Sequence, residues 1–448
     1  MPIPGSYLRS LYSLAPVTGV SVAGYKSIRD ECSIEIAPLT LLAGANSSGK
    51  SSIVQPLLLL KQTLEANYDA GPLLINGPNV RFTEAKQILS RAPRLARVSE
   101  FRVRVAKGKR ASLGLAFRQT GVGFDIAEML VEDEHEKRSL RPGMSGDELQ
   151  KMLHRDIQAL RKDGLPFPPD ESLTLHVLRD WCFLAVGLRS DKRRGQFPAV
   201  YSPGLILSED LRGIIHVPGL RGNPERTYRK TPIGPDFPGT FENYVASVIH
   251  RWKETKDPNL AGLADALERL GLTWKITASP VDDASLEVKV GRLPHSRRGY
   301  ASDLVSIADV GMGVSEVLPV LVALLAARKE QIVFIEQPEF HLHPNAQHEL
   351  ASVIADAAKR RARLIVETHS SLLLLGIQRL IAEGKLNPNL VRLHWFQRDS
   401  ETGKTSVASV TPDVKGAFGD WPEDFDKVLL EAQGKYMDAV ERTLAAGR

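Results

Sequence analysis

Residues 44–51 read Gly-Ala-Asn-Ser-Ser-Gly-Lys-Ser and match the pattern G-x-x-x-x-G-K-[ST]. An apolar, strand-like run at 39–43 precedes the motif, and a helical pattern over 50–66 follows it. In this context the motif folds into a phosphate-binding loop, because small residues let backbone N–H groups and the helix N-terminus approach an anion. The motif therefore predicts that ATP binds here together with Mg²⁺.

The side chains of the motif have separate expected roles. We expect Lys50 to neutralise charge on the β- and γ-phosphates, and the Ser51 hydroxyl to coordinate magnesium. The residues expected to contact the nucleotide are Gly44, Asn46, Ser47, Ser48, Gly49, Lys50, Ser51 and Ser52.

The C-terminal part of the chain alternates between helical and strand-like segments. We expect a helix at 311–328, a strand at 331–336, a helix at 346–360 and a strand at 363–369. Apolar, β-branched strands in such an alternation indicate a parallel sheet covered on both faces. Residues 17–43 are expected to form a strand pair whose second strand leads into the loop. Both ends of the chain should therefore contribute to one nucleotide-binding sheet.

The middle of the chain is less regular. Expected strands lie at 101–106, 111–117, 123–131 and 285–290, and expected helices at 146–163, 240–253 and 259–270, while 187–235 is rich in Arg, Gly and Pro. The predicted division is an N-terminal ATPase lobe at 1–135, an inserted helical and irregular region at 136–284, a C-terminal ATPase lobe at 285–400 and a small C-terminal extension at 401–448. The predicted fold class is thus α/β, a P-loop NTPase with a mixed sheet and an inserted region.

Polar residues follow the two apolar strands near the C-terminus. Glu336 ends the first strand and is followed by Gln337 and Glu339, and His369 follows the second. Ligands of open α/β sheets bind at the carboxyl ends of the strands, so these residues should meet the phosphate loop. We expect Glu336 to hold the magnesium shell, Gln337 or Glu339 to orient or deprotonate the attacking water, and His369 to bond the γ-phosphate.

Four segments in this order resemble the ABC-type ATPase heads of the SMC, RecF and OLD-like group: GANSSGKSS, DVGMGVSEV, IEQPEFHLHP and ETHS. More narrowly, DVGMGVSEVLPVL and the late GDWPEDF (419–425) look like prokaryotic AAA-family ATPases with a small C-terminal domain of unknown function. The resemblance covers 20–90 and 300–425 well and the middle poorly.

The resemblance implies roles for further residues. Lys50 and Ser51 match the Walker A motif, and Glu336 matches the magnesium-binding position of Walker B. His369 matches the switch histidine, and residues 343–345 match the D-loop. Residues 309–316 would be the signature segment, which in the family meets the γ-phosphate of the opposite subunit, so that two heads enclose ATP. The signature residues expected there are Gly311, Gly313 and Ser315.

Two positions depart from the family pattern. The usual catalytic glutamate is replaced by Gln337. An amide can position water but cannot accept its proton, so hydrolysis should be slow or rely on Glu339. The signature serine–glycine pair is also absent in its usual form, so Gly311 or Ser315 must serve.

The resemblance implies a sensor or scaffold that assembles on ATP in prokaryotic defence against phage or foreign DNA, with a separately encoded nuclease as effector. The alternative is a RecF- or SMC-like repair ATPase that binds DNA directly. A self-contained OLD-like nuclease is disfavoured, because no D-x-D pair in a strand context follows His369. A transporter ATPase subunit fits the insertion poorly.

Composition adds weaker constraints. The net charge of +5 over 448 residues leaves room for a basic face without proving nucleic-acid binding. Two cysteines, Cys32 and Cys182, are too few for a disulfide framework. The first residues lack a signal-peptide pattern, and no apolar run reaches the length needed to cross a bilayer; the best candidate, at 53–60, contains Gln55 and Pro56. We therefore expect a cytoplasmic protein with no membrane contact.

Two other residue groups have competing interpretations. Basic residues in the inserted region could form a solvated surface or a DNA-facing patch: Arg189, Lys192, Arg193, Arg194, Arg221, Arg226, Arg229 and Lys230. The histidines at 341, 343 and 348 could suggest a metal site, but H-E-x-x-H and the carboxylate pattern of zinc enzymes are absent.

Overall fold

The computed structural model describes residues 15–91, 97–134, 136–154, 173–190, 199–293, 295, 303–419 and 437. Several predicted features lie outside these residues: the second half of the helix expected at 146–163, the basic residues Lys192, Arg193 and Arg194, and nearly all of the segment at 419–425.

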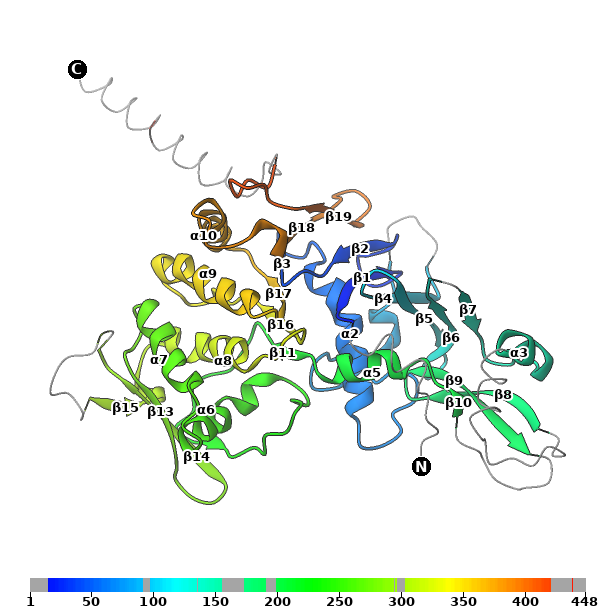
Figure 1. Cartoon of the computed structure of the whole chain (residues 1–448), viewed down its shortest axis with the longest axis horizontal. Helices are drawn as coiled ribbons and strands as arrows, with labels where there is room; N and C mark the ends of the chain where they lie inside the picture. Colours follow the sequence, from blue (N-terminus) through cyan, green and yellow to red (C-terminus); the bar gives the residue numbers. More distant parts are fainter. Residues whose placement is uncertain are drawn as a thin grey trace.

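A central six-stranded sheet combines both ends of the chain (Figure 1). Its strands, in spatial order, are β11 (Ile215–Val217), β16 (Ile332–Glu336), β17 (Arg363–Glu367), β3 (Leu39–Gly44), β18 (Val391–Arg398) and β19 (Thr405–Val410). The first five are mutually parallel, and β19 pairs antiparallel with β18. The predicted mixed α/β sheet is confirmed.

Helices cover both faces of this sheet, as the apolar strands require. The successive residues Leu41 and Leu42 of β3 point to opposite faces of the sheet and belong to two separate hydrophobic cores. The predicted helices are present as α8 (Met312–Ala326) and α9 (Pro344–Lys359), followed by α10 (Ser371–Ala382). These three pack in the first core, whereas α2 (Lys50–Glu65) packs in the second and continues through Pro56.

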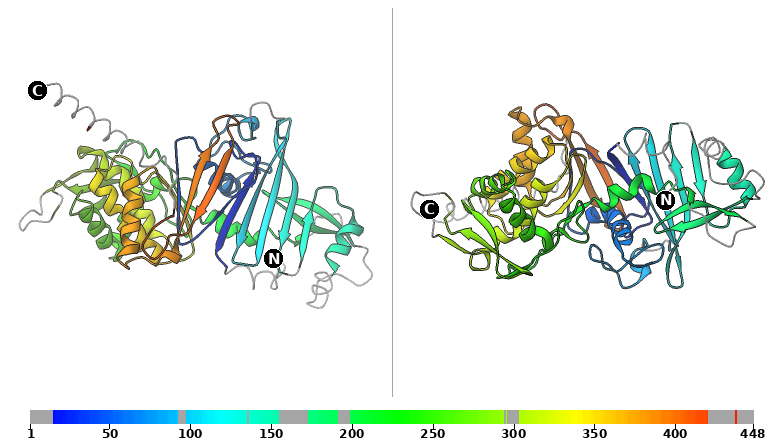
Figure 2. Two further views of the ribbon diagram at one scale, coloured as in Figure 1. Left: turned by 90° about the horizontal axis from the view of Figure 1, so that it is seen from above. Right: turned by 60° about the horizontal axis from the view of Figure 1, so that its bottom comes forward.

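A second six-stranded sheet lies beside the first and is antiparallel throughout. Its order is β2 (Cys32–Glu35), β1 (Val17–Ala23), β4 (Glu100–Lys107), β5 (Ala111–Thr120), β6 (Gly123–Glu132) and β7 (Lys137–Leu140). Alternate residues of β4 point into the core, so this sheet has one packed face. In Figure 2 the orange strands β18 and β19 run beside these blue and cyan strands.

The strand pair expected at 17–43 needs a correction. β1 does pair with β2, but the strand that leads into the loop, β3, pairs with β17 and β18 in the other sheet. β3 is buried along its whole length, which suits a central parallel strand rather than the half-buried antiparallel sheet.

The middle of the chain contains more strand than we expected. Its elements are α3 (Gly146–Met152), β8 (Leu173–Asp180), β9 (Phe183–Ser190), β10 (Ala199–Tyr201), α5 (Leu205–Arg212), β12 (Tyr228–Arg229), α6 (Val245–Glu254), α7 (Asn259–Arg269), β13 (Ile276–Pro280), β14 (Ser285–Gly291) and β15 (Leu304–Ser306). Short 3-10 turns occur at Ala85–Gln87, Phe241–Tyr244, Ile307–Asp309 and Pro388–Leu390. The helices predicted at 240–253 and 259–270 are present as α6 and α7.

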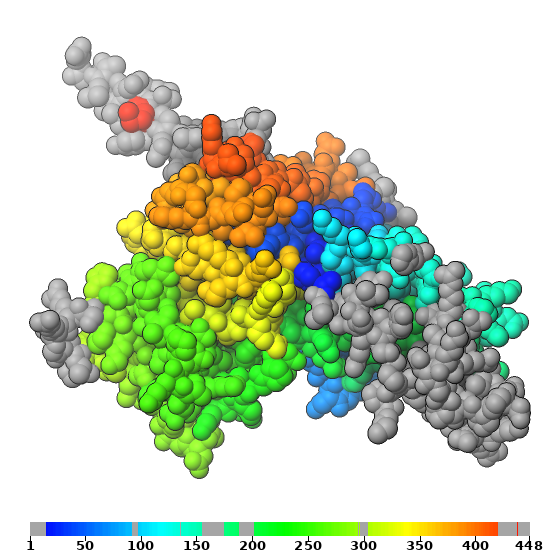
Figure 3. Space-filling model, in the orientation of Figure 1, coloured from blue at the N-terminus to red at the C-terminus, as the bar shows by residue number. Residues whose placement is uncertain are grey.

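Two lobes result, one built on the antiparallel sheet and one on α6 to α9 and the sheet of β12 to β15. In Figure 3 the green and yellow residues gather on one side of the molecule and the cyan residues on the other. Both cysteines are buried and free. In the described part of the chain, no helix has the length and apolar character that crossing a bilayer requires.

Candidate functional site

The loop between β3 and α2 adopts a conformation that depends on glycine. Gly49, directly before α2, has φ of 104°, in the left-handed region that side chains rarely adopt. A Cβ at Gly49 would lie 2.5 Å from Thr405 Oγ1, and a Cβ at Gly44 would collide with the carbonyl oxygen of Phe396. Both glycines are therefore required by close packing against the β18–β19 hairpin.

The β18–β19 hairpin holds the loop through hydrogen bonds, a contact that the sequence did not lead us to expect. Thr405 Oγ1 lies 2.7 Å from Ser48 O, to which it donates, and 2.8 Å from Ser27 Oγ. Arg398 Nη1 donates to Ser47 O at 3.4 Å. β19 thus belongs to the nucleotide-binding sheet even though it lies in the segment expected to be a C-terminal extension.

The interior of the loop suits a polyanion. Lys50 Nζ is buried and donates to Gly44 O at 3.1 Å and to Ala45 O at 2.8 Å. Burial lowers the pKa of Lys50, and the carboxylates of Glu367 and Glu339 oppose that shift. Ser48 Oγ is buried and has no hydrogen-bond partner among the described residues. A cation and an unpaired hydroxyl in a glycine cradle are the donor set that phosphate oxygens need.

The strand ends bring carboxylates next to this loop. Glu336 Oε1 lies 3.2 Å from His216 Nε2, and its Oε2 accepts a hydrogen bond from Gly219 N at 3.1 Å. Burial acts to raise the pKa of Glu336, but the hydrogen bonds and the charges of His216 and Arg221 outweigh it, so that the pKa is lowered. Glu336 is therefore held ionised.

Glu367, the last residue of β17, is a site residue that sequence reasoning missed. It is the register partner of Glu336 and is only 6% exposed. Its Oε2 atom is buried without a hydrogen-bond partner in the described part of the chain. Burial raises the pKa of Glu367 to about 7, against the opposing effect of the Ser51 hydrogen bond. A carboxylate at the end of an apolar strand was the available signal.

A hollow of about 510 Å³ opens beside the loop and is lined by Asn46, Gln337, Glu339, Phe340, His341, Gln347, His369 and Ser370. The structure thus brings together the loop and three of the predicted catalytic residues. Glu339 Oε1 accepts from Thr368 Oγ1 at 2.9 Å and from His369 N at 2.8 Å. Its Oε2 is buried and has no hydrogen-bond partner in the ranges described, and burial raises the pKa of Glu339.

His369 faces the phosphate loop from the end of β17. Burial lowers its pKa, the Lys50 charge lowers it further, and a hydrogen bond with the Gly44 backbone acts in the opposite direction. The imidazole is therefore biased to its neutral form, in which one ring nitrogen donates a hydrogen bond and the other accepts one.

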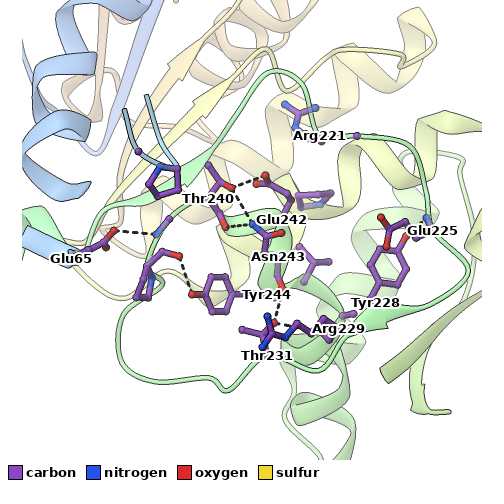
Figure 4. A pocket seen from close by; sticks show the side chains of 18 of the residues that line it. Glu65, Arg221, Glu225, Tyr228, Arg229, Thr231, Thr240, Glu242, Asn243 and Tyr244 are labelled. Atoms are coloured by element: carbon purple, nitrogen blue, oxygen red, sulfur yellow. Dashed lines mark hydrogen bonds between the residues drawn. The ribbon is translucent and has the colours of Figure 1, made fainter. Parts of the chain in front are cut away.

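The expected signature residues lie elsewhere. Gly311 precedes α8, Gly313 lies in its first turn, and Ser315 Oγ donates to Met312 O at 2.9 Å. None of the three lines the 510 Å³ hollow. Ser315 instead borders a separate hollow of about 830 Å³, shown in Figure 4 with Arg221 at its edge. Within one chain, α8 is therefore not brought to the phosphate loop.

Arg221 corrects the expectation of a surface basic patch. Its side chain is buried, and its Nη2 donates to Glu336 O at 2.6 Å and to Gln337 O at 3.1 Å. Arg226 forms an ion pair with Asp309 at 2.8 Å, while Arg229 and Lys230 are exposed. The side chain of Arg189 lies outside the described structure.

The oxygen ligands around the phosphate loop suit magnesium. The described residues contain no group of three or more His, Cys, Asp or Glu side chains that could hold a metal ion. Magnesium keeps several waters and needs only one or two protein carboxylates with the phosphates. Ser51 and the strand-end carboxylates satisfy that smaller requirement.

Solved structures with a similar arrangement include SMC head domains. One is the SMC head bound to the C-winged helix domain of ScpA, with 12% identity and a TM-score of 0.48 over 88% of this chain and 98% of that one. Another is an SMC head with coiled coil and joint from Pyrococcus yayanosii, with 10% identity and a TM-score of 0.47 over 94% of this chain and all of that one. The SMC head from Thermotoga maritima gives 10% identity and a TM-score of 0.41 over 88% of this chain and 99% of that one.

No protein of curated function matches the sequence. A family model described as "AAA domain, putative AbiEii toxin, Type IV TA system" matches residues 39–375. The matched region begins with β3 and includes the phosphate loop, α8, β16 and His369, so the resemblance to AAA-family ATPases is confirmed. Since the match spans well over half of the sequence, the chain belongs to this AAA-domain family.

Proposed function

We propose that the protein binds ATP with magnesium, hydrolyses it slowly, and assembles with a second copy of itself when ATP is bound. The observation that carries the proposal is the 510 Å³ hollow, where Asn46 of the phosphate loop faces Gln337, Glu339 and His369. Binding, water positioning and phosphate sensing require these groups in one place.

Slow hydrolysis follows from the acid–base groups around the hollow. Gln337 can orient a water molecule but cannot accept its proton. Glu339 has one carboxylate oxygen held by Thr368 and the His369 amide and the other without a partner in the described structure, so the second oxygen is available as a proton acceptor. Magnesium, when bound, would neutralise charge on the phosphates.

Assembly follows from the position of α8. The hollow is open to solvent, and the first turn of α8, with exposed Met312, lies outside it. A second copy presenting that helix N-terminus to the γ-phosphate would close the site, because helix N-termini favour anions.

The biological setting remains a proposal supported by the family description, which names a type IV toxin–antitoxin system. We propose a cytoplasmic sensor or scaffold in defence against phage or foreign DNA, which acts through a separately encoded effector, such as a nuclease. Direct DNA binding is the less favoured alternative, because Arg221 is buried and Arg226 is paired with Asp309.

The test is phosphate release from Mg–ATP by the purified protein. We expect turnover that is slow and is lost in Lys50→Ala. Fast turnover that is undiminished in Glu339→Gln would contradict the proposed route for the proton.

A further inference from the structure

The ring of His216 lies against the strand that carries Glu336. His216 belongs to β11, and its register partner in β16 is Phe334. The two rings stack with centroids 5.5 Å apart and an angle of 12° between their planes, and His216 is 2% exposed. Phe334 packs in the same core as α2, and Glu336 follows it by two residues in the strand, so both project to that face of the sheet. His216 and the carboxylate of Glu336 therefore meet on the face that α2 covers.

The hydrogen bonds of His216 assign a direction to its contact with Glu336. Asn79 Nδ2 lies 3.1 Å from His216 Nδ1 and donates to Gly239 O at 3.0 Å. A carbonyl oxygen only accepts hydrogen bonds, so Gly239 places the amide nitrogen of Asn79, rather than its oxygen, beside the ring. That nitrogen donates to Nδ1, which leaves the ring proton on Nε2, 3.2 Å from Glu336 Oε1. His216 is therefore the donor and Glu336 the acceptor.

Asn79 is itself held by the helix that begins in the phosphate loop. Gln62 of α2 is 1% exposed, and its Oε1 accepts hydrogen bonds from Asn79 N at 3.2 Å and from Val80 N at 2.9 Å. Its Nε2 donates to Val80 O at 3.1 Å. Both ends of this buried amide thus hold the segment that carries Asn79. Because α2 begins at Lys50, a series of contacts joins the helix of the phosphate loop to the carboxylate at the end of β16.

The carboxylate of Glu336 is oriented by two donors. His216 donates to Oε1, and Gly219 N donates to Oε2 at 3.1 Å. A carboxylate oxygen can accept a second bond, so both oxygens keep capacity for a further partner. Magnesium demands near-ideal octahedral geometry and binds through one or two carboxylates, whose orientation depends on the groups that hydrogen-bond to them. The donors behind Glu336 therefore bear on how well it serves the ion.

We propose that His216, held by Asn79, is a positioning residue that sets the orientation in which the Glu336 carboxylate meets the magnesium shell. This inference rests on the proposed binding of Mg–ATP. His216 does not line the 510 Å³ hollow, so it acts through Glu336 rather than on the nucleotide.

The test separates binding of the divalent cation from binding of the nucleotide. Mn²⁺ binding in the presence of ATP is followed by electron paramagnetic resonance, and affinity for a fluorescent ATP analogue is measured in EDTA. His216→Phe keeps a ring to stack on Phe334 and removes both nitrogens, whereas His216→Gln keeps an amide nitrogen that can donate to Glu336. The matched control is His394→Phe in β18, because His394 is also fully buried and hydrogen-bonded at both ring nitrogens.

We expect His216→Phe to weaken Mn²⁺ binding roughly tenfold to a hundredfold, the range typical of partners behind a metal ligand. His216→Gln should recover most of this loss, and His394→Phe should bind Mn²⁺ as the unmodified protein does. ATP affinity in EDTA should be unchanged in all three variants, which also shows that each is folded.

Asn79→Ala provides a milder variant, because Asn79 is only half-buried. It removes the donor to His216 Nδ1 and should weaken Mn²⁺ binding in the same direction by a smaller factor. Equal Mn²⁺ affinities of His216→Phe and His394→Phe, or no recovery in His216→Gln, would overturn the assignment. If His216→Phe did not fold, unchanged Mn²⁺ affinity in Asn79→Ala would overturn it. If the unmodified protein bound no ATP, the proposed function itself would fail instead.

Discussion

The buried guanidinium of Arg221 connects the carboxylate of Glu316 in α8 to the end of β16. Arg221 Nη1 lies 3.5 Å from Glu316 Oε2 and donates to Glu316 O at 3.1 Å, while Nη2 donates to Glu336 O. Both side chains are almost completely buried. The helix proposed to meet the second copy is therefore joined directly to the backbone that carries Gln337.

Removing Arg221 should destabilise the protein strongly. Arg221→Met leaves Glu316 as an uncompensated buried charge and removes the Arg221 hydrogen bonds to the carbonyl oxygens of Glu316, Glu336 and Gln337. Breaking such a buried pair costs about 3–5 kcal/mol. Urea unfolding should show a clearly lower midpoint, whereas Arg226→Met, at an exposed pair, should leave the midpoint nearly unchanged. Equal effects of the two substitutions would show that the Arg221 contacts are not structural.

The hydroxyl of Thr405 should matter for nucleotide affinity although the residue lies outside the motif. Thr405→Val removes the hydrogen bond to Ser48 O, a loss of about 1 kcal/mol or roughly fivefold in ATP affinity. Thr405→Ser keeps the hydroxyl and should bind ATP almost normally. Calorimetric titration of both variants with ATP tests this prediction. Equal ATP affinities of Thr405→Val and Thr405→Ser would show that the hairpin contact does not contribute to ATP binding.

Local patterns predicted much of the fold and part of the site. The loop, α8, β16, α9 and β17 could be expected because each shows its own periodicity and the motif fixes the order. The role of the β18–β19 hairpin could not, because its contact with the loop depends on pairing between distant segments. Glu367 was missed for a related reason: its proximity to Ser51 depends on which strand lies next to β3.

The burial of the charged Arg221 side chain could not be predicted from the sequence either. Arg221 was grouped with surface cations, because basic residues in an irregular segment are usually solvated. Its burial depends on partners in α8 and β16 that lie far away along the chain. The register of parallel strands and the partners of buried charges are tertiary properties, which local periodicity does not encode.

ATP turnover should depend on pH through Glu339. Burial raises the pKa of this carboxyl above its ordinary value, and only the deprotonated form can accept a proton from water. Turnover should therefore fall as the pH falls through that raised pKa, at a higher pH than for an exposed glutamate. Glu339→Gln should lower kcat roughly a hundredfold or more and abolish this limb of the profile. If Glu339→Gln showed the same fall in turnover at low pH, a group other than Glu339 would be responsible for that fall.

ATP-dependent assembly should be sensitive to Gly311. A Cβ at this position meets nothing within 4 Å, and the backbone has φ of −62°, so Gly311→Arg should fold normally. An arginine side chain at the start of α8 would block close approach of a second head. Mass measurements with and without ATP should show assembly of the Glu339→Gln protein but not of Glu339→Gln combined with Gly311→Arg. Assembly of both would place the contact elsewhere.

The central claim is that the loop at 44–51 binds Mg–ATP through the buried Lys50. Calorimetric titration of the unmodified protein and of Lys50→Ala with Mg–ATP tests it most directly. We expect saturable binding by the unmodified protein and no binding by Lys50→Ala. The substitution removes Lys50, which is the only cation inside the loop among the residues that the structure describes. Unchanged ATP affinity in Lys50→Ala would contradict the account.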